Sequence, residues 1–267
     1  MKRTTTGIAL LLVLGGCTGT ATPSAPDAAD SVQLVRVLDG DSLVVDLDGT
    51  GIEVRLLGIN TPERNECFDA EAKARTTELA ADQVRLVGSD EDRFGRLLRY
   101  AYAADDTLIN QQLVAEGLAL ALSTGHSLSN EFKKAEAAAF QQRLGRWQAD
   151  ACGPATNTAL EISGLESDAP GDDSRNRNGE WVEITNTGSQ PALLDDWSLQ
   201  DESSSHRFKF PPGFALAPGA EVRVSSGCGT PSGDQLFWCD DDPVWSNRGD
   251  TAYLLDSAGN VVDRWAF

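Results

Sequence analysis

Three short segments of the sequence carry side chains whose chemistry suits phosphodiester hydrolysis. The segments span residues 38–42, 55–63 and 92–96. Asp41 and Asn60 offer side-chain oxygens, and Thr61 offers a backbone carbonyl in a loop. Oxygen ligands on loops suit a hard cation such as calcium or magnesium rather than a transition metal. We therefore expect a cation site formed by Asp41, Asn60 and Thr61.

The same segments carry a carboxylate and two guanidinium groups. Glu63 follows a proline, and a carboxylate beside a metal-bound water can act as a general base. Arg55 and Arg96 could each bind a phosphate through two parallel hydrogen bonds and offset charge that develops in the transition state. We predict catalytic roles for Arg55, Glu63 and Arg96.

Each segment taken alone has an ordinary structural explanation. The Asp-Gly-Asp sequence at 39–41 is typical of a hairpin turn, Glu63 could be a solvated loop residue, and Arg55 could be a surface arginine beside Glu53. The combination, in this order along one predicted barrel, is what favours a single site.

The elements that would position these residues are short strands and three helices. Runs rich in β-branched residues, separated by Asp-Gly turns, predict a three-stranded meander, and two later strands would close a five-stranded barrel. The predicted strands span residues 32–38, 43–47, 52–58, 84–87 and 97–103. The predicted helices span residues 68–81, 108–116 and 130–144.

The character of the sequence changes after Cys152-Gly153-Pro154. Helical patterning ends, and short strands follow at nearly regular spacing between turn residues, as in an antiparallel sandwich. The predicted strands span residues 181–184, 197–199, 208–210, 222–224, 251–255 and 261–265. A length of 267 residues also favours two domains. We place them at 31–153 and 157–267 and expect a β-rich, two-domain chain.

The first 30 residues have the pattern of an export signal followed by a tether. Two basic residues precede an apolar run that is too short to span a membrane. The run ends in Leu-Gly-Gly-Cys17, which resembles a bacterial lipobox. We expect residues 1–17 to be a lipoprotein signal that ends at the lipidated Cys17, and residues 18–30 to be a flexible tether. The protein would then be exported and lipid-anchored in the bacterial membrane or envelope; the alternative is a secreted protein with a chance cysteine.

The other four of the five cysteines suit disulfides in an oxidising compartment. Three pairings are possible. We favour Cys67 with Cys152 and Cys228 with Cys239, because each bridge then stays within one predicted domain. A zinc site is not expected, because the sequence has no Cys-x-x-Cys motif and its two histidines are isolated.

Residues 32–150 resemble a staphylococcal nuclease-type (thermonuclease) domain. The resemblance rests on Asp39 to Asp41, on Arg-Leu-Leu-Gly-Ile-Asn-Thr-Pro-Glu at 55–63, and on Phe94-Gly95-Arg96, and it continues through residues 97–100 and 110–118. It implies a five-stranded OB-fold barrel with three helices (α+β) and an endonuclease that hydrolyses DNA and RNA with one calcium ion. Glu63 would be the general base, Arg55 and Arg96 the phosphate ligands, and Asp41, Asn60 and Thr61 the calcium ligands.

Two departures from that family pattern bear on affinity. Asn60 stands where the family usually has aspartate, and the loss of one ligand charge predicts weaker calcium binding. The family's base-stacking tyrosines are also missing: Phe94 keeps a ring, but residues 123–125 offer none. A base-stacking contact contributes about 1–3 kcal/mol. The net charge of -19 further disfavours tight binding of nucleic acid.

Residues 157–267 resemble a lamin-tail domain, an immunoglobulin-like β-sandwich. The resemblance rests on residues 180–188, 194–199, 214–219 and 245–252, and it implies an accessory role. Two functions follow for the whole chain: a surface-anchored calcium-dependent nuclease acting on weakly bound DNA or RNA, or an OB-fold binding module that has lost its catalysis. We favour the nuclease, because the carboxylates and both arginines are retained together, and we expect no obligate protein partner.

Overall fold

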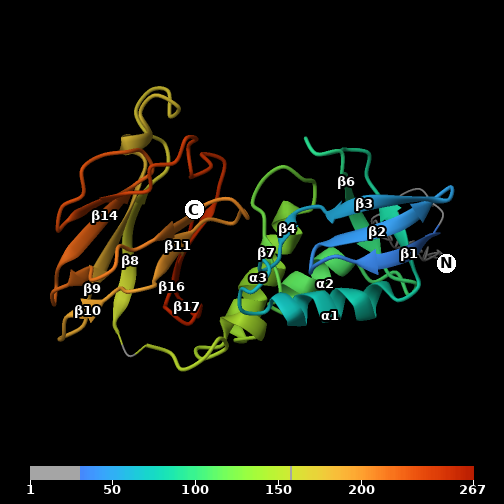
Figure 1. Cartoon of the computed structure of the whole chain (residues 1–267), viewed down its shortest axis with the longest axis horizontal. Helices are drawn as coiled ribbons and strands as arrows, with labels where there is room; N and C mark the ends of the chain where they lie inside the picture. Colours follow the sequence, from blue (N-terminus) through green and yellow to red (C-terminus); the bar gives the residue numbers. More distant parts are fainter. Residues whose placement is uncertain (1–30, 157) are drawn as a thin grey trace, which may run out of the picture.

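The computed structural model describes residues 31–156 and 158–267, which form two bodies side by side (Figure 1). The predicted signal, the predicted tether and the predicted lipidation site Cys17 lie outside the described residues. Within the described part, no helix is both long and apolar enough to span a membrane.

The first body is a closed five-stranded barrel with the strand order β1-β2-β3-β6-β5. The strands are β1 (Ser31–Val37), β2 (Ser42–Leu47), β3 (Thr50–Leu56), β5 (Gln83–Val87) and β6 (Leu97–Tyr102). Only β3 and β6 pair in parallel; the other pairs are antiparallel. Fully buried residues such as Leu43, Val45 and Val54 fill the interior, and burying them supplies most of the stability of the barrel. The predicted barrel is confirmed.

Three helices cover the barrel, as predicted. They are α1 (Asp69–Ala80), α2 (Ile109–Ala115) and α3 (Ser129–Gln141), and a single 3-10 turn, η1 (Gly145–Trp147), follows α3. Helix α3 ends before the predicted Leu144, because Arg143 adopts a left-handed φ of 55° that a helix cannot accommodate. A two-stranded sheet of β4 (Ile59–Asn60) and β7 (Leu120–Ala121) was not predicted; two residues are too few to form a recognisable pattern.

The second body is a sandwich of two four-stranded sheets, as predicted. One sheet has the order β12-β11-β16-β17 and the other β15-β14-β9-β8. The strands of the first are β11 (Ser198–Gln200), β12 (Arg207–Lys209), β16 (Thr251–Leu255) and β17 (Val261–Ala266). Those of the second are β8 (Leu160–Glu166), β9 (Trp181–Asn186), β14 (Glu221–Ser225) and β15 (Gln235–Phe237), with η2 (Arg177–Gly179) before β9. A small extra sheet pairs β10 (Ala192–Leu193) with β13 (Ala215–Leu216).

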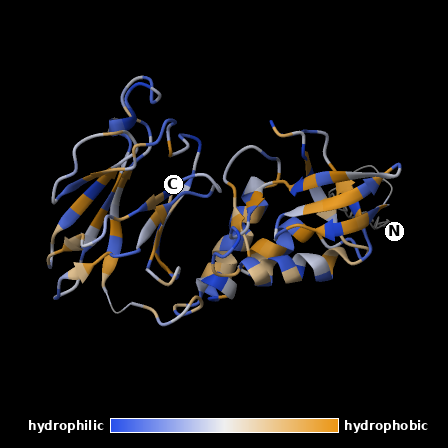
Figure 2. Ribbon diagram, in the orientation of Figure 1, coloured by the Kyte–Doolittle hydropathy of each residue, from blue (hydrophilic) through white to orange (hydrophobic). Residues whose placement is uncertain are grey.

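Apolar residues of both sheets meet between them. Trp197, Leu199, Ile184 and Val222 are almost fully buried in that layer. Hydrophobic and hydrophilic residues alternate along several strands (Figure 2), as expected for sheets that face a core on one side. Strands β8, β10, β13 and β15 were not predicted from the sequence.

Two disulfides are present, with the expected pairing. Cys67 joins Cys152 across 85 residues, and Cys228 joins Cys239 across 11 residues. The Cys67–Cys152 bridge links the chain just after residues 55–63 to the C-terminal end of the barrel domain. It therefore restrains the loop of the candidate site from its C-terminal side.

The barrel and the sandwich share a buried apolar cluster. Leu120, Ala139 and Trp147 from the barrel side pack with Tyr253 and Leu255 of β16. The Trp147 and Tyr253 rings lie 6.0 Å apart between centroids. Because these side chains are buried only when the two bodies are together, their burial stabilises one fixed arrangement of the domains.

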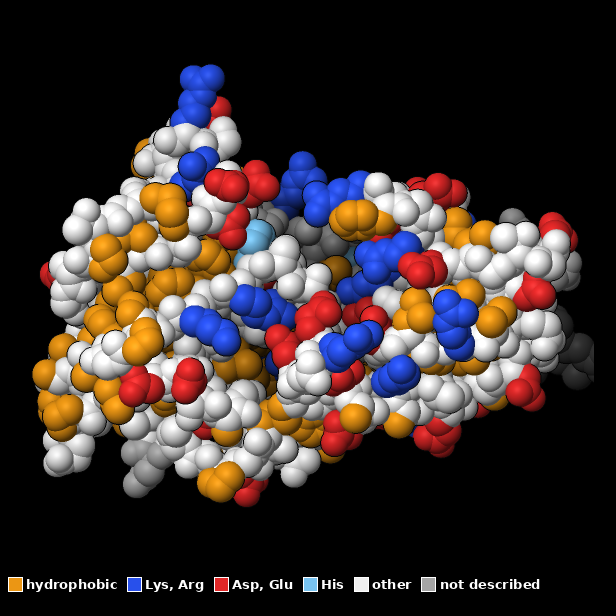
Figure 3. Space-filling model, viewed as in Figure 1, with side chains coloured by type: hydrophobic (Ala, Val, Ile, Leu, Met, Phe, Trp, Pro, Cys, Tyr) orange, Lys and Arg blue, Asp and Glu red, His pale blue; other side chains and the backbone are white. Residues whose placement is uncertain are grey.

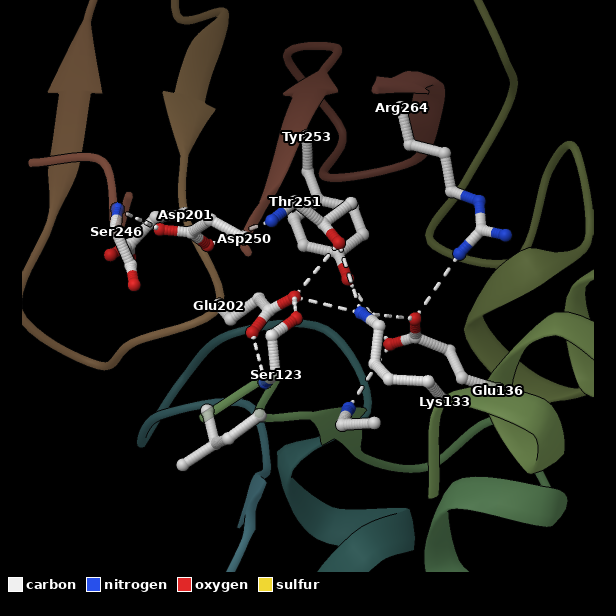
Figure 4. A network of polar contacts seen from close by, with 12 residues as sticks. Ser123, Lys133, Glu136, Asp201, Glu202, Ser246, Asp250, Thr251, Tyr253 and Arg264 are labelled. Atoms are coloured by element: carbon white, nitrogen blue, oxygen red, sulfur yellow. Dashed lines mark hydrogen bonds and ion pairs between the residues drawn. The ribbon is translucent and has the colours of Figure 1, made fainter. Parts of the chain in front are cut away.

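A polar network surrounds this cluster (Figure 4). Glu202 of the sandwich accepts hydrogen bonds from the Ser123 hydroxyl and from Lys133 of α3, both at 2.7 Å. Glu136 of α3 is fully buried; it accepts a hydrogen bond from the Tyr253 hydroxyl at 3.1 Å and pairs with Arg264 at 3.2 Å. Removing one charged residue of the network would leave its buried partner unpaired. The network therefore favours a single relative arrangement of the two domains.

The folded chain should be more stable at mildly acidic pH than at pH 8. Burial, together with Asp201 and Glu202, raises the pKa of Asp250 to about 7. The hydrogen bond to Asp201 raises the pKa of His206, while Lys133 stays paired with Glu202. Both shifted groups hold a proton more tightly in the folded state than in the unfolded state. Asp250 should therefore lower the free energy of unfolding as pH rises from about 4 through 7, by about 2–3 kcal/mol between pH 5 and pH 8. His206 adds a further fall that begins above about pH 6.5.

Asp250→Asn should make this pH dependence markedly shallower, because the side chain at 250 no longer titrates; the His206 contribution remains. Chemical denaturation of the wild type and the variant at pH 5 and pH 8 measures the effect. Equal pH dependence in the two proteins would contradict it, as would a wild type that is more stable at pH 8.

Candidate active site

The turn between β1 and β2 places Asp41 in the interior. Gly40 is required there, because a Cβ at this position would lie 2.7 Å from both the Thr61 hydroxyl oxygen and the Ala72 Cβ. The carbonyl oxygen of Gly40 accepts a hydrogen bond from Thr76 of α1. The tight turn therefore packs against α1 and directs the next residue, Asp41, toward the end of β3.

Asp41 is 5% exposed, and both oxygens of its carboxylate have partners in the protein. Its Oδ2 accepts a hydrogen bond from the Thr61 backbone N–H at 2.7 Å and lies 3.0 Å from Nη1 of Arg55. Its Oδ1 accepts a hydrogen bond from the Ser42 hydroxyl at 3.2 Å. Burial raises the pKa of Asp41 although the positive charge of Arg55 acts in the opposite direction.

Arg55, on β3, joins the turn to the loop that follows the strand. Its Nη2 donates to Oδ1 of Asn60 at 3.1 Å, and its Nη1 donates to the Ile59 carbonyl at 2.9 Å. Asp41 and Asn60 thus converge on one guanidinium. Asn60 and Thr61 are each 2% exposed, and β4 holds Asn60 against Leu120 of β7. The structure brings together four of the predicted residues: Asp41, Arg55, Asn60 and Thr61.

Glu63 lies in the same loop, two residues after Thr61, and is exposed. Its backbone N–H donates to Oε2 of Glu66 at 2.9 Å, which fixes the loop backbone. Partial burial raises the pKa of Glu63, and the negative charges of Asp41 and Asp39 raise it further. Glu63 and Asp39 line a surface hollow of about 630 Å³. A carboxylate with a raised pKa, open to solvent at a hollow, is suited to accepting a proton from water.

Arg96 is not brought into contact with this cluster among the described residues. Its Nε pairs with Oδ2 of Asp92 at 2.7 Å, within the turn that also carries Phe94. Burial alone would raise the pKa of Asp92. The pKa is nevertheless lowered, because Asp92 accepts hydrogen bonds from the Arg96 side chain and from the backbone N–H groups of Arg96 and Phe94. Phe94 is 70% exposed, so its ring is free to contact a ligand. Only Nε of Arg96 is engaged by Asp92, so its two terminal nitrogens could still donate to a phosphate.

The residues at the centre of the site suit a hard cation by their chemistry. All the candidate donors are oxygens, and no cluster of three or more His, Cys, Asp or Glu residues in a metal-binding arrangement occurs between residues 31 and 156 or 158 and 267. Burial is the main cause of the raised pKa values of Asp41 and Glu63, and neighbouring carboxylates, Asp39 for both and Asp41 for Glu63, add to it. A cation held by Asp41, Asn60 and the Thr61 carbonyl would stabilise the charged form of both carboxylates.

Comparison with known proteins agrees with the fold of the barrel domain. The family described as staphylococcal nuclease homologue matches residues 53–149. A micrococcal nuclease of Shigella flexneri is 34% identical over 125 residues, which cover 43% of this chain and 72% of that protein. A thermonuclease of Staphylococcus intermedius is 34% identical over 140 residues, which cover 45% of this chain and 82% of that protein. The chain belongs to the staphylococcal nuclease family.

Two further matches complete the comparison. A prophage-derived endonuclease, YokF, of Bacillus subtilis (strain 168) is 33% identical over 129 residues, which cover 43% of each chain. The family described as Lamin Tail Domain matches residues 154–267. This member of the staphylococcal nuclease family therefore carries a lamin-tail domain after its barrel.

Some residues that shape the site were not identified from the sequence. Asn110 is fully buried and donates to the Leu57 carbonyl at 2.9 Å, while its Oδ1 accepts from the Ala101 N–H. It thereby ties the end of β3 to β6 and α2. Glu66 was also missed. Nothing in the sequence marks it, because its role depends on the fold of the 63–66 turn.

Proposed function

We propose that the protein is a calcium-dependent nuclease that hydrolyses DNA, RNA or both, and that it is anchored at the bacterial surface by a lipidated Cys17. The observation that carries the proposal is the convergence of Asp41 and Asn60 on Arg55, in the loop that also bears Glu63. Membership of a family that includes nucleases supports it. The lipobox-like sequence supports the anchoring, and the acidity of the chain supports weak substrate binding.

The roles of the residues follow from their positions. Glu63 would take a proton from the attacking water. Arg55 would share its donors between Asp41 and a phosphate oxygen, and Arg96 would add a second guanidinium through the terminal nitrogens that Asp92 does not engage. Calcium bound by Asp41, Asn60 and Thr61 would supply a Lewis acid beside the phosphate. Backbone contacts to Asp41 and Arg55 hold both residues in place before substrate arrives, which lowers the cost of organising the site.

One experiment separates this function from the alternative of a non-catalytic OB-fold module. The purified chain is incubated with end-labelled single-stranded DNA or RNA in millimolar calcium, and the products are resolved by length. We expect progressive shortening of the substrate. Retention of intact nucleic acid in complexes, with no shortening over a broad range of pH and calcium concentration, would support the binding module. The presence of Asn60 in place of aspartate is the observation that favours that alternative.

Asn60→Asp should strengthen calcium binding. The substitution adds a negative charge beside Asp41, and the number of ligand charges tunes calcium affinity. Half-maximal cleavage should then occur at a calcium concentration about tenfold lower, a change that corresponds to about 1.4 kcal/mol. Calcium titrations of the cleavage rate measure it. A half-maximal concentration that is unchanged or higher would argue against Asn60 as a ligand.

A further inference from the structure

Arg146 is a buried cation between the two domains. It lies in η1, is 8% exposed, and its backbone N–H donates to the Gly117 carbonyl at 3.0 Å. Its Nε is buried without a hydrogen-bond partner, and no ion pair within the described chain reaches the guanidinium. Burial lowers the pKa of Arg146. Burying a charge without a partner costs free energy, and a bound ligand of opposite charge would offset that cost.

Arg146 lines a cavity of about 330 Å³ between the domains. The volume is at the lower end of those that hold small organic ligands. The sandwich contributes two more cations to the lining, Arg207 and Lys209 of β12. Arg207 Nε, like that of Arg146, is buried without a hydrogen bond, and Lys209 is exposed. Charged side chains of both signs gather over the junction of the domains (Figure 3).

Three carboxylates also line the cavity, but two of them are already engaged. Asp256 accepts hydrogen bonds from the backbone N–H groups of Ala258 and Asn260, both at 2.9 Å, within its own turn. Glu66 lies 3.5 Å from Arg207 Nε and accepts the N–H of Glu63. The third, Asp196, is exposed to water. Among the described residues, Arg146 is therefore the buried charge of this lining whose side chain makes neither an ion pair nor a hydrogen bond. Its guanidinium lies over the Trp147 ring, 5.6 Å from the centroid, and the negative charge of Glu66 acts on it without a direct contact.

The cavity is continuous with the loop of the candidate site. Pro62, Asn65 and Glu66 belong to its lining and flank Glu63 on both sides in the sequence. Glu66 links the cavity to the loop of the candidate site. Its Oε2 accepts a hydrogen bond from the Glu63 backbone N–H, and its Oε1 pairs with Nε of Arg207. A nucleic-acid strand that crosses Glu63 carries further phosphates on either side of the bond to be cleaved. One of these could enter the cavity and meet three cations.

We infer that the interdomain cavity binds a phosphate group of the nucleic-acid chain next to the cleaved bond, through Arg146, Arg207 and Lys209. The inference rests on the proposed function for the identity of the ligand. It assigns the lamin-tail domain a part in substrate binding, because two of the three cations belong to it. It also accounts for the unpaired burial of Arg146, whose partner arrives with the substrate.

Binding can be measured without catalysis, on the full chain in EDTA. Inorganic phosphate is compared with chloride at equal ionic strength, and the unfolding temperature Tm is recorded against phosphate concentration. We expect phosphate to raise the Tm of the wild type. Lys209→Gln should weaken the apparent phosphate affinity about tenfold, the effect of losing one charge-assisted hydrogen bond. The control is Arg175→Gln, which removes a charge of the same sign from an exposed loop of the same domain.

Arg146→Met gives a second, independent readout. Methionine keeps the length of the aliphatic stem but removes the buried charge, so the Tm without phosphate should rise while the phosphate-dependent increase disappears. A merely structural arginine would give a lower Tm in this variant. The inference is overturned if phosphate raises the Tm of Arg146→Met and Lys209→Gln as much as that of the wild type.

Cleavage kinetics separate this inference from the proposed function. With an oligonucleotide substrate, Lys209→Gln should raise KM severalfold and leave kcat unchanged, whereas Arg175→Gln should change neither. If phosphate binds as expected but neither the wild type nor any variant cleaves the oligonucleotide, the phosphate site in the cavity is supported and the nuclease assignment fails. If the wild type cleaves but Lys209→Gln has the wild-type KM and phosphate response, the nuclease stands and the cavity assignment fails.

Discussion

Glu63→Gln should cleave single-stranded DNA about 10²–10⁴-fold more slowly than the wild type, the usual contribution of a general base. The amide has nearly the same shape as the carboxylate, but it cannot take a proton from water. The fall should appear in kcat with little change in KM, because Glu63 is exposed and makes no side-chain hydrogen bond or ion pair among the described residues. Single-turnover and steady-state rates on one labelled oligonucleotide measure both quantities.

A matched control for this variant is Glu71→Gln. Glu71 is an exposed carboxylate in the first turn of α1, and its neutralisation removes the same charge away from the reacting groups. It should retain the wild-type rate, and both variants should keep the wild-type Tm. Equal rates for Glu63→Gln and Glu71→Gln would remove Glu63 from the mechanism.

Arg55→Ala should affect both stability and activity more than any other substitution in the site. It leaves the buried carboxylate of Asp41 without its ion-pair partner and the Asn60 side chain without its donor. Breaking a buried pair from one side costs about 3–5 kcal/mol. Urea denaturation should therefore show a large loss in the free energy of unfolding, and cleavage should be abolished.

Arg55→Lys separates the two effects of the arginine. Lysine keeps the positive charge beside Asp41 but not the planar set of donors that reaches Asn60 and the Ile59 carbonyl as well. We expect most of the stability to return while the cleavage rate stays about 10²-fold low, as when one transition-state donor is lost.

The control for the arginine variants is Arg85→Ala, on β5 of the same barrel. Arg85 pairs at 2.7 Å with Asp106, whose side chain is 80% exposed, and its guanidinium lies over the Tyr102 ring, 4.2 Å from the centroid. An ion pair open to water contributes about 0–1 kcal/mol, and an exposed cation–π contact about 0.5–1 kcal/mol. Arg85→Ala should therefore lose much less stability than Arg55→Ala and keep the wild-type cleavage rate. If Arg55→Ala resembled it in both respects, the role of Arg55 at the centre of the site would be wrong.

The sequence predicts the fold well where local pattern and burial agree. Runs rich in β-branched residues predict strands β1 to β3, and the Asp-Gly turns between these runs predict that the three strands form a meander. The prediction fails where an element depends on contacts distant in sequence. Strands β4 and β7 have two residues each and exist because Ile59 and Asn60 meet Leu120 and Ala121. Strand β15 pairs in parallel with β14, and its Gln235-Leu236-Phe237 sequence is too short to indicate that pairing.

The candidate site was predicted in part, for a related reason. Asp41, Arg55, Asn60 and Thr61 lie at strand ends that the barrel necessarily brings together. Arg96 and Asp92 are four residues apart, a separation short enough for the sequence to indicate their pairing. The contact of Arg207 with Glu66 joins different domains. The burial of Arg146 also depends on how the domains pack, which no local pattern encodes.

The central claim is that Glu63 acts with a calcium ion bound by Asp41, Asn60 and Thr61 to hydrolyse nucleic acid. The most direct test is the cleavage rate of one single-stranded DNA by the wild type and by Glu63→Gln, each in millimolar calcium and in EDTA. We predict rapid cleavage only by the wild type in calcium. Wild-type cleavage that persists at the same rate in EDTA, or that Glu63→Gln matches in calcium, would contradict the claim.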